Sequence, residues 1–317
     1  MRKKLVSTLM AGLMGVMLAA CGSASAAEGA AEAVSTAPDS AETVSTSAEE
    51  ASTEAVATES ASATAGETSE DVQAIIDRGV LRVGVKNAVI GFGYEDPLTG
   101  EYSGLEIELA KALAGKLGVD VEFIAVTAAT RTELLDSGDI DCVLATFTIT
   151  DERKESWDFT TPYYTDYVSV LVEDSKGITT LENLVDATVG VSSGSTSAKS
   201  LVSAMIEAGL ISGDGFDPET FDPATWTTGV KFQQYDDYPT ISTALSAGEV
   251  DAFCVDKSIL AIYKTEGRSY IDAEFSPQEY GIATKKASGL SAVTEELVTA
   301  LLADGTIDSL IKENGLE

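Results

Sequence analysis

Histidine is missing from the chain, and basic residues are few. The 317 residues include no histidine, 20 Lys+Arg and 52 Asp+Glu, which gives a formal net charge of −32. Without an imidazole there is no Ser-His-Asp or Cys-His nucleophile pair and no common histidine-containing zinc site. The negative charge argues against nucleic acid as a partner, because such binding depends on Lys and Arg that neutralise phosphates. We therefore expect no metal, no cofactor and no nucleic acid.

The N-terminus has the features of a targeting segment, and its apolar run is too short to span a membrane. Basic Arg2, Lys3 and Lys4 precede an uncharged run over residues 5–20, whereas a span takes roughly 20 apolar residues. The run ends in Leu-Ala-Ala-Cys, which resembles the lipobox of bacterial lipoproteins. Cleavage of signal peptide 1–20 would make Cys21 the lipidated N-terminus, anchored to the outer face of the cytoplasmic membrane. The alternative is an ordinary secretory signal with an incidental cysteine, and either reading exports the protein.

Residues 21–69 lack the apolar content of a folded domain. From Gly22 to Ser69 the chain is rich in Ala, Ser, Thr and Glu and contains no aromatic residue, Lys or Arg. Such a segment cannot bury enough apolar surface to offset its ordering entropy. We expect a disordered tether. An Ala/Glu-rich helix is the alternative, although β-branched and Ser/Thr residues interrupt it every few positions.

Strand-like and helix-like segments alternate over residues 70–317, which predicts α/β lobes with mainly parallel sheets flanked by helices. The predicted strands are 80–86, 121–126, 142–146, 188–192, 231–235 and 252–255, and the predicted helices are 105–117, 131–137, 197–208 and 240–247. Cys142 and Cys254 each fall in a buried strand. A disulfide is conceivable in an exported protein, but the two strands lie in separate halves of the pattern, which favours two free thiols.

One stretch carries a specific family resemblance. The sequence LATFTITDERKESWDFTTPYY at 144–164 resembles the signature of the polar amino-acid-binding proteins that serve ABC importers. Further matching segments follow in the right order: RVGVKN (82–87), YSGLEIELAKAL (102–113), DYPTI (237–241), VDKSIL (255–260) and YGIATKK (280–286). The likeness covers nearly all of residues 75–317 and is closest to the aspartate/glutamate-binding members.

The resemblance implies the fold and the function. It implies a type II periplasmic-binding-protein fold, with lobe 1 from residues 70–165 plus 276–317 and lobe 2 from residues 166–275. Two strands would cross between the lobes near 163–170 and 275–281. An acidic amino acid would bind in the interlobe cleft, the lobes would close, and the closed form would dock on a permease whose ATPase powers uptake. The membrane would be contacted through the lipid anchor only.

The ligand groups predict the chemistry of the site. An α-carboxylate favours a bidentate Arg and helix N-terminal amides, and Thr150 can cap a short helix from which Arg153 projects. The resemblance implies that Thr146, Thr148 and Arg153 hold this carboxylate, with the carbonyl of Ala145 nearby. The alternative role for Arg153 is an ion pair with a neighbouring acid.

The ligand ammonium requires a carboxylate, which the resemblance assigns to Asp256. The alternative for Asp256 is to cap the helix that starts at Lys257. Ser195 and Thr196, at another helix start, would add contacts from lobe 2, although any Ser/Thr-rich helix start looks similar.

Two cations predict an acidic ligand side chain. Lys86 and Arg131 fall where the aspartate/glutamate binders carry cleft cations, and a buried cation is costly unless it is paired. Tyr238, before Pro239, is a candidate for a hydroxyl or lid contact, although Tyr-Pro is also a routine helix start. Residues 209–229 lengthen lobe 2, their Asp spacing does not fit an EF-hand loop, and we expect a surface excursion.

The competing function is an enzyme on the same fold, such as the prephenate/arogenate dehydratases that the family resembles. That function needs a general acid in the cleft, and no residue can be assigned to it. An Asp256 and Arg153 pair suits an intact zwitterion, so we expect a receptor and not an enzyme. The preference between Asp and Glu, the identity of the permease and the role of 209–229 do not follow from the sequence.

Overall fold

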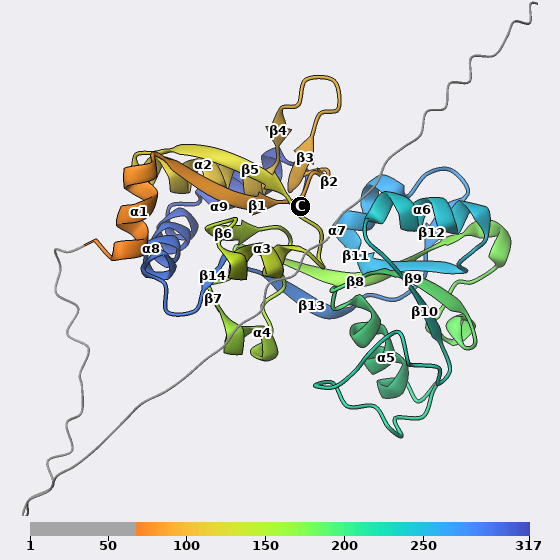
Figure 1. The fold of residues 1–317 in the computed structure, drawn as a ribbon. Coiled ribbons are helices and arrows are strands. Elements are labelled where there is room, and N and C mark those ends of the chain that lie inside the picture. Colours follow the sequence, from red (N-terminus) through yellow and green to blue (C-terminus); the bar gives the residue numbers. More distant parts are fainter. Residues whose placement is uncertain (1–67) are drawn as a thin grey trace, which may run out of the picture. The chain divides into compact units, whose positions relative to one another are not determined.

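The computed structural model describes residues 68–317, which lie in one compact unit. The predicted signal peptide, Cys21 and residues 22–67 of the predicted tether lie outside the described residues. Within the unit, two β-sheets with their own helices form two lobes, named here by their sheets (Figure 1). The lobe limits predicted above remain predictions.

The sheet of lobe 1 has the strand order β5-β1-β6-β14-β7. Its strands are β1 (Val80–Val85), β5 (Asp120–Ala125), β6 (Cys142–Leu144), β7 (Trp157–Phe159) and β14 (Ala283–Lys285). Strand β1 lies between β5 and β6, and its alternate residues Leu81, Val83 and Val85 are fully buried. The helices of this lobe are α1 (Glu70–Arg78), α2 (Leu105–Leu117), α3 (Arg131–Ser137), α4 (Asp151–Ser156), α8 (Gly289–Ala303) and α9 (Thr306–Glu313).

A small antiparallel sheet connects β1 to α2. It consists of β2 (Ala88–Val89), β3 (Gly93–Glu95) and β4 (Tyr102–Ser103). Gly104 follows it at φ 125°, and a Cβ there would lie 2.2 Å from the carbonyl oxygen of Phe92. Only glycine therefore fits at the start of α2, which fixes where Glu106 enters the core.

The sheet of lobe 2 has the order β10-β9-β11-β8-β12, with β13 paired to β8. Its strands are β8 (Tyr164–Glu173), β9 (Thr188–Ser192), β10 (Lys231–Tyr235), β11 (Ala252–Asp256), β12 (Arg268–Tyr270) and β13 (Phe275–Tyr280). Its helices are α5 (Ser197–Glu207), α6 (Tyr238–Ala247) and α7 (Lys257–Leu260), and 3₁₀ turns occupy Asp174–Lys176, Leu181–Leu184 and Ala261–Tyr263.

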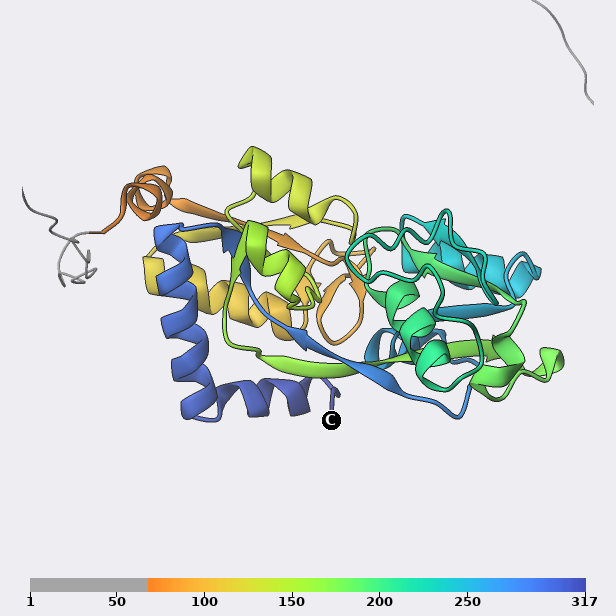
Figure 2. The same ribbon diagram turned by 90° about the horizontal axis from the view of Figure 1, so that it is seen from below.

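Two strands run between the lobes. Strands β8 and β13 pair antiparallel and lie side by side from one lobe to the other (Figure 2). They match the crossings predicted near 163–170 and 275–281, and we call them the hinge strands. Both sheets are mixed: three neighbouring strands in each are parallel, and antiparallel strands are added where the chain crosses or returns.

Most predicted elements are present, and two differences have a local cause. The strand predicted at 142–146 ends at Leu144, because Thr146 adopts a left-handed φ of 45° that a strand cannot contain. The helix predicted at 240–247 begins at Tyr238, because Asp237 caps it through the backbone N–H of Thr240. Cys142 and Cys254 are free buried thiols, as expected.

The 209–229 segment is more than a surface excursion. Most of its residues are exposed, but Phe216, Phe221 and Trp226 pack on one another, and Phe221 contacts Phe232 of β10. Aromatic packing of this kind holds the segment against lobe 2. Its Pro218 and Phe221 also line the space between the lobes.

Candidate functional site

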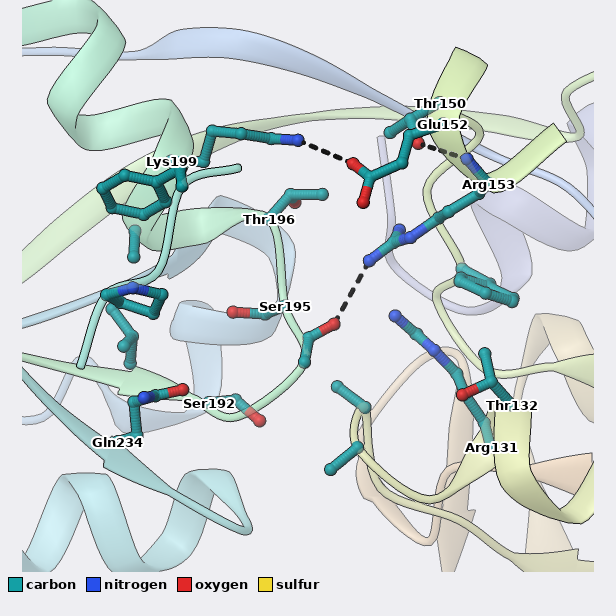
Figure 3. A pocket seen from close by; sticks show the side chains of 18 of the residues that line it. Arg131, Thr132, Thr150, Glu152, Arg153, Ser192, Ser195, Thr196, Lys199 and Gln234 are labelled. Atoms are coloured by element: carbon teal, nitrogen blue, oxygen red, sulfur yellow. Dashed lines mark hydrogen bonds and ion pairs between the residues drawn. The ribbon is translucent and has the colours of Figure 1, made fainter. Parts of the chain in front are cut away.

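A polar cavity lies where the two lobes meet. It encloses about 240 Å³ of empty space between lobe 1 loops and the starts of α5 and α7. Seven of the ten predicted ligand-binding residues line it: Arg131, Thr146, Thr148, Ser195, Thr196, Tyr238 and Asp256. An outer chamber of about 1040 Å³ adjoins it and includes Arg153 (Figure 3). Lys86 lies beside Tyr238 in a third pocket of about 300 Å³, and Ala145 takes part through its carbonyl.

Arg153 crosses the gap between the lobes. Thr150 caps α4 by accepting a hydrogen bond from the Arg153 backbone N–H at 3.1 Å, as predicted. The guanidinium donates to the carbonyl of Thr148 at 2.7 Å. It also donates to the carbonyl of Gly194 in lobe 2 at 3.2 Å, the bond drawn as a dashed line from the Arg153 guanidinium in Figure 3. Burial lowers the pKa of Arg153 to about 9, which leaves it protonated at pH 7.

The neighbouring acids leave Arg153 available. Glu152 pairs with Lys199 at 3.1 Å and Asp151 with Lys154 at 3.5 Å, so the alternative ion pair for Arg153 does not form. On the opposite side, Gly194 has a φ of 74°, and a Cβ there would lie 2.8 Å from the carbonyl oxygen of Ala128. Glycine at this position lets the lobe 2 loop approach lobe 1.

Arg131 opens α3 and is buried against an aromatic ring that the sequence analysis did not single out. Its Nη1 donates to the carbonyls of Ala145 at 2.8 Å and Thr146 at 3.3 Å. Its Cζ lies 3.9 Å from the ring centroid of Phe147, and the Cζ of Arg153 lies 4.7 Å from the same centroid. Cation–π attraction therefore helps to hold both guanidinium groups at the cavity wall.

Unpartnered polar atoms gather at the cavity. Among residues 68–317, eight buried side-chain polar atoms have no hydrogen-bond partner. Four of them belong to cavity residues: Arg131 Nε, Thr146 Oγ1, Ser195 Oγ and Ser197 Oγ. Buried polar groups are nearly always hydrogen-bonded, because an unmade bond costs about 1–3 kcal/mol. The cavity is therefore built to receive polar atoms from outside the chain.

Lys86 and Glu106 are two buried charged residues near the site. Lys86 follows β1, is buried, and lies with its Nζ 5.3 Å from the ring centroid of Tyr238. Burial lowers the pKa of Lys86 to about 7. Glu106, which the sequence analysis missed, is also buried, and its pKa is raised by desolvation. No local pattern distinguishes Glu106 from any acid in the first turn of a helix.

Asp256 ends β11 and is not a side-chain cap. It occupies the N-cap position of α7 but makes no capping hydrogen bond, and Asp166 of β8 accepts from the backbone N–H of Ser258 at 3.1 Å instead. The capping alternative for Asp256 is therefore wrong. Its carboxylate accepts from the hydroxyl of Tyr280, and burial raises its pKa to about 7.

The hinge contributes a residue that no motif signals. Gln278 of β13 accepts from the hydroxyls of Thr148 at 2.8 Å and Thr196 at 2.7 Å. One threonine belongs to lobe 1 and the other to lobe 2. A single hinge side chain thus ties together two predicted ligand-binding residues, one from each lobe.

The site suits binding better than catalysis. Within the described part of the chain, no group of acidic or cysteine side chains could hold a metal ion, and no helix is long and apolar enough to cross a membrane. A polar cavity closed between two hinged lobes, with cations on one side and Asp256 on the other, defines a solute-binding protein.

The family comparison agrees with that class. The chain belongs to the bacterial extracellular solute-binding proteins, family 3, whose family model matches residues 81–315. It is 32% identical over 262 residues to the ABC transporter glutamine-binding protein GlnH of Bacillus subtilis, covering 78% of this chain and 87% of that protein. It is 31% identical to the glutamate-binding protein GluB of Corynebacterium glutamicum, covering 76% of this chain and 80% of that protein.

A solved structure shares the fold. An ancestral arginine-binding protein bound to glutamine superposes with a TM-score of 0.61 at 32% identity, covering 76% of this chain and 99% of that one. The chain is thus an ABC-type amino-acid solute-binding protein with the two-lobed type II fold. The relatives named here are transport and binding proteins, so the dehydratase alternative is set aside.

Proposed function

We propose that this chain is the extracytoplasmic substrate-binding lipoprotein of an ABC importer, which binds aspartate or glutamate and delivers it to the permease and its ATPase. One observation carries the acidic specificity. Lys86, Arg131 and Arg153 all lie at the interlobe site, and across residues 68–317 none of them forms an ion pair.

The charges of the ligand account for these cations. An amino-acid zwitterion needs one cation for its carboxylate and one carboxylate for its ammonium, which Arg153 and Asp256 supply. Lys86 and Arg131 remain, and the buried carboxylate of Glu106 opposes one of these two positive charges. One buried positive charge is left without a counter-charge, which is costly. A second carboxylate, on the ligand side chain, provides this counter-charge. The relatives' names include both glutamine and glutamate, so the charges in the cleft decide the proposal.

The proposed pose follows from the positions of the open groups. The α-carboxylate lies between Arg153, Thr148 and the start of α5 at Ser195 and Thr196, where helix N-terminal amides favour an anion. The ammonium lies at Asp256. The side chain points toward Arg131, Thr146 and Tyr238, with Lys86 behind.

Isothermal titration calorimetry tests the specificity. The protein is unfolded, dialysed to remove carried-over ligand and refolded before titration with glutamate, aspartate, glutamine and asparagine. We expect glutamate or aspartate to bind at least about tenfold more tightly than its amide, the equivalent of one charged contact of about 1.4 kcal/mol. Equal or tighter binding of glutamine would refute the acidic specificity and leave the amino-acid-binding function intact.

Membrane fractionation tests the anchor. If Cys21 carries the lipid, a Cys21→Ser variant should be released from membranes or remain unprocessed. Correctly cleaved, membrane-bound protein from that variant would refute the lipoprotein proposal.

A further inference from the structure

Glu106 is a fully buried carboxylate beside the ligand cavity that no ligand role yet explains. It lies in the first turn of α2 with 0% of its surface exposed. Its Oε1 accepts from the backbone N–H of Thr146 at 2.6 Å and from the hydroxyl of Tyr163 at 2.6 Å. Its Oε2 is buried and has no hydrogen-bond partner among the described residues. A carboxylate is favoured at a helix N-terminus, where the helix dipole is positive.

The first contact holds a strained residue of the cavity wall. Thr146 has a φ of 45°, a region that β-branched residues rarely adopt because it strains the backbone. Its N–H is held by Glu106, and its carbonyl accepts from Arg131 Nη1 at 3.3 Å. Glu106 and Arg131 therefore hold the same residue, one through its backbone N–H and the other through its carbonyl.

Glu106 also interacts electrostatically with the cations of the site. Desolvation raises the pKa of Glu106, and the hydrogen bonds from Tyr163 and Thr146 and the positive charges of Lys86 and Arg131 oppose that shift. Burial and the repulsion of Arg131 and Arg153 lower the pKa of Lys86, and the charges of Glu106 and Asp256 oppose that shift. An ionised Glu106 thus offsets part of the positive charge that faces the ligand side chain.

We propose that Glu106 is a positioning and specificity-determining residue of the ligand site. Its Oε1 fixes Thr146 in the left-handed conformation, and its charge limits the excess positive charge of Lys86 and Arg131 to what one ligand carboxylate can neutralise. The inference rests on the proposed side-chain role of these two cations. Glu106 acts through Thr146, Lys86 and Arg131 and does not touch the ligand itself.

Two substitutions separate the two roles. Glu106→Gln keeps an oxygen that can accept from Thr146 and Tyr163 but removes the charge, whereas Glu106→Leu removes both. Glu108→Gln is the matched control, because Glu108 lies on the same helix with 44% of its side chain exposed and pairs with Lys111 on the surface. Dissociation constants for glutamate and glutamine are measured at pH 6, where Lys86 is protonated, and at pH 8.

We expect Glu106→Gln to shift the ratio of glutamate to glutamine affinity toward glutamate by about tenfold at pH 6, because one opposing charge is removed from a buried site. The shift should be smaller at pH 8, since Lys86 loses its proton more readily without Glu106. Glu106→Leu should weaken both ligands and lower the melting temperature, while Glu108→Gln should leave the ratio unchanged.

A Glu106→Gln protein that binds both ligands with the same factor of change, at both pH values, would overturn the proposal and leave a purely structural side chain. The ratio does not depend on which ligand the unmodified protein prefers. A wild-type preference for glutamine would instead refute the acidic specificity, so the two failures are distinguishable.

Discussion

Two buried arginines behave in opposite ways in this molecule. Arg268, in β12 of lobe 2, is 8% exposed and uses all three guanidinium nitrogens. It pairs with Glu173 at 2.8 Å and donates to groups on α6 and the following 3₁₀ turn: the Ser242 hydroxyl and carbonyl, the Ser246 hydroxyl and the Tyr263 carbonyl. Arg131 is 3% exposed, uses Nη1 alone, and leaves Nε without a partner in the described part of the chain.

The difference separates a structural cation, Arg268, from Arg131, which we propose binds the ligand. Every acceptor of Arg268 comes from its own lobe, so its charge is neutralised before any ligand arrives. Arg131 faces the cavity and finds only carbonyl oxygens. Burial alone therefore does not identify a functional arginine; Arg131 stands out because it combines burial, an unused donor and the lack of an ion pair among the described residues.

The largest expected effect is on stability, in Arg268→Met. The change leaves Glu173 and the α6 acceptors without their partner. We expect a loss of about 3 kcal/mol in the free energy of unfolding. This is the low end for a broken buried pair, because 26% of the Glu173 side chain is exposed. Urea denaturation of the ligand-free protein measures it. Ligand affinity of the folded protein should be unchanged, and a large loss of affinity would break the distinction between the two arginines.

The next effect is on affinity, in Arg131→Met. We expect aspartate and glutamate to bind about 1.5–3 kcal/mol more weakly, roughly 10- to 150-fold, as for a lost charged hydrogen bond. Asparagine and glutamine should lose much less, because their amides bring no charge to neutralise. The free energy of unfolding should be unchanged or higher, since an unpaired buried cation is removed. Unaltered binding of both acids would show that Arg131 does not meet the side chain.

The smallest effect is a pH dependence, which extends the comparison to the acidic side of the site. Among residues 68–317, the Asp256 carboxylate accepts a hydrogen bond from the Tyr280 hydroxyl alone, and burial raises its pKa to about 7. Below pH 7 the ligand ammonium must displace a proton from Asp256, so affinity should fall by up to about tenfold per pH unit from 7 toward 5. Calorimetry with glutamine isolates this effect, because Lys86 then meets no ligand charge.

The same pKa shift sets the sign for stability. The carboxyl of Asp256 titrates higher in the folded protein than in the unfolded chain, where its pKa is 3.8. Its contribution to the stability of the ligand-free protein should therefore decrease as the pH rises from about 4 to about 7 and stay constant above. Asp256→Asn is the control: it should remove both pH dependences and weaken binding at every pH. A persistent slope in that variant would assign the proton to another group.

Local sequence determined much of the fold. Helices α2 and α3 and strands β9 and β10 have the predicted bounds, and Gly118 and Gly138 end the two helices in the left-handed conformation. The family signature at 144–164 located Thr148 and Arg153 at the cleft, and the Thr150 cap was predictable from its spacing.

Only the tertiary structure decided which polar residues act together. Glu106 meets Thr146 across 40 residues, Thr148 meets Gln278 across 130, and Asp166 replaces Asp256 as the cap of Ser258 across 92. Sequence spacing reports neighbours within a helix or along a strand, and these pairs form only when two lobes and two hinge strands come together. For the same reason, the sequence showed that Arg131 and Arg268 exist, and the folded chain decided that Arg268 is neutralised within its own lobe while Arg131 is left open toward the cleft.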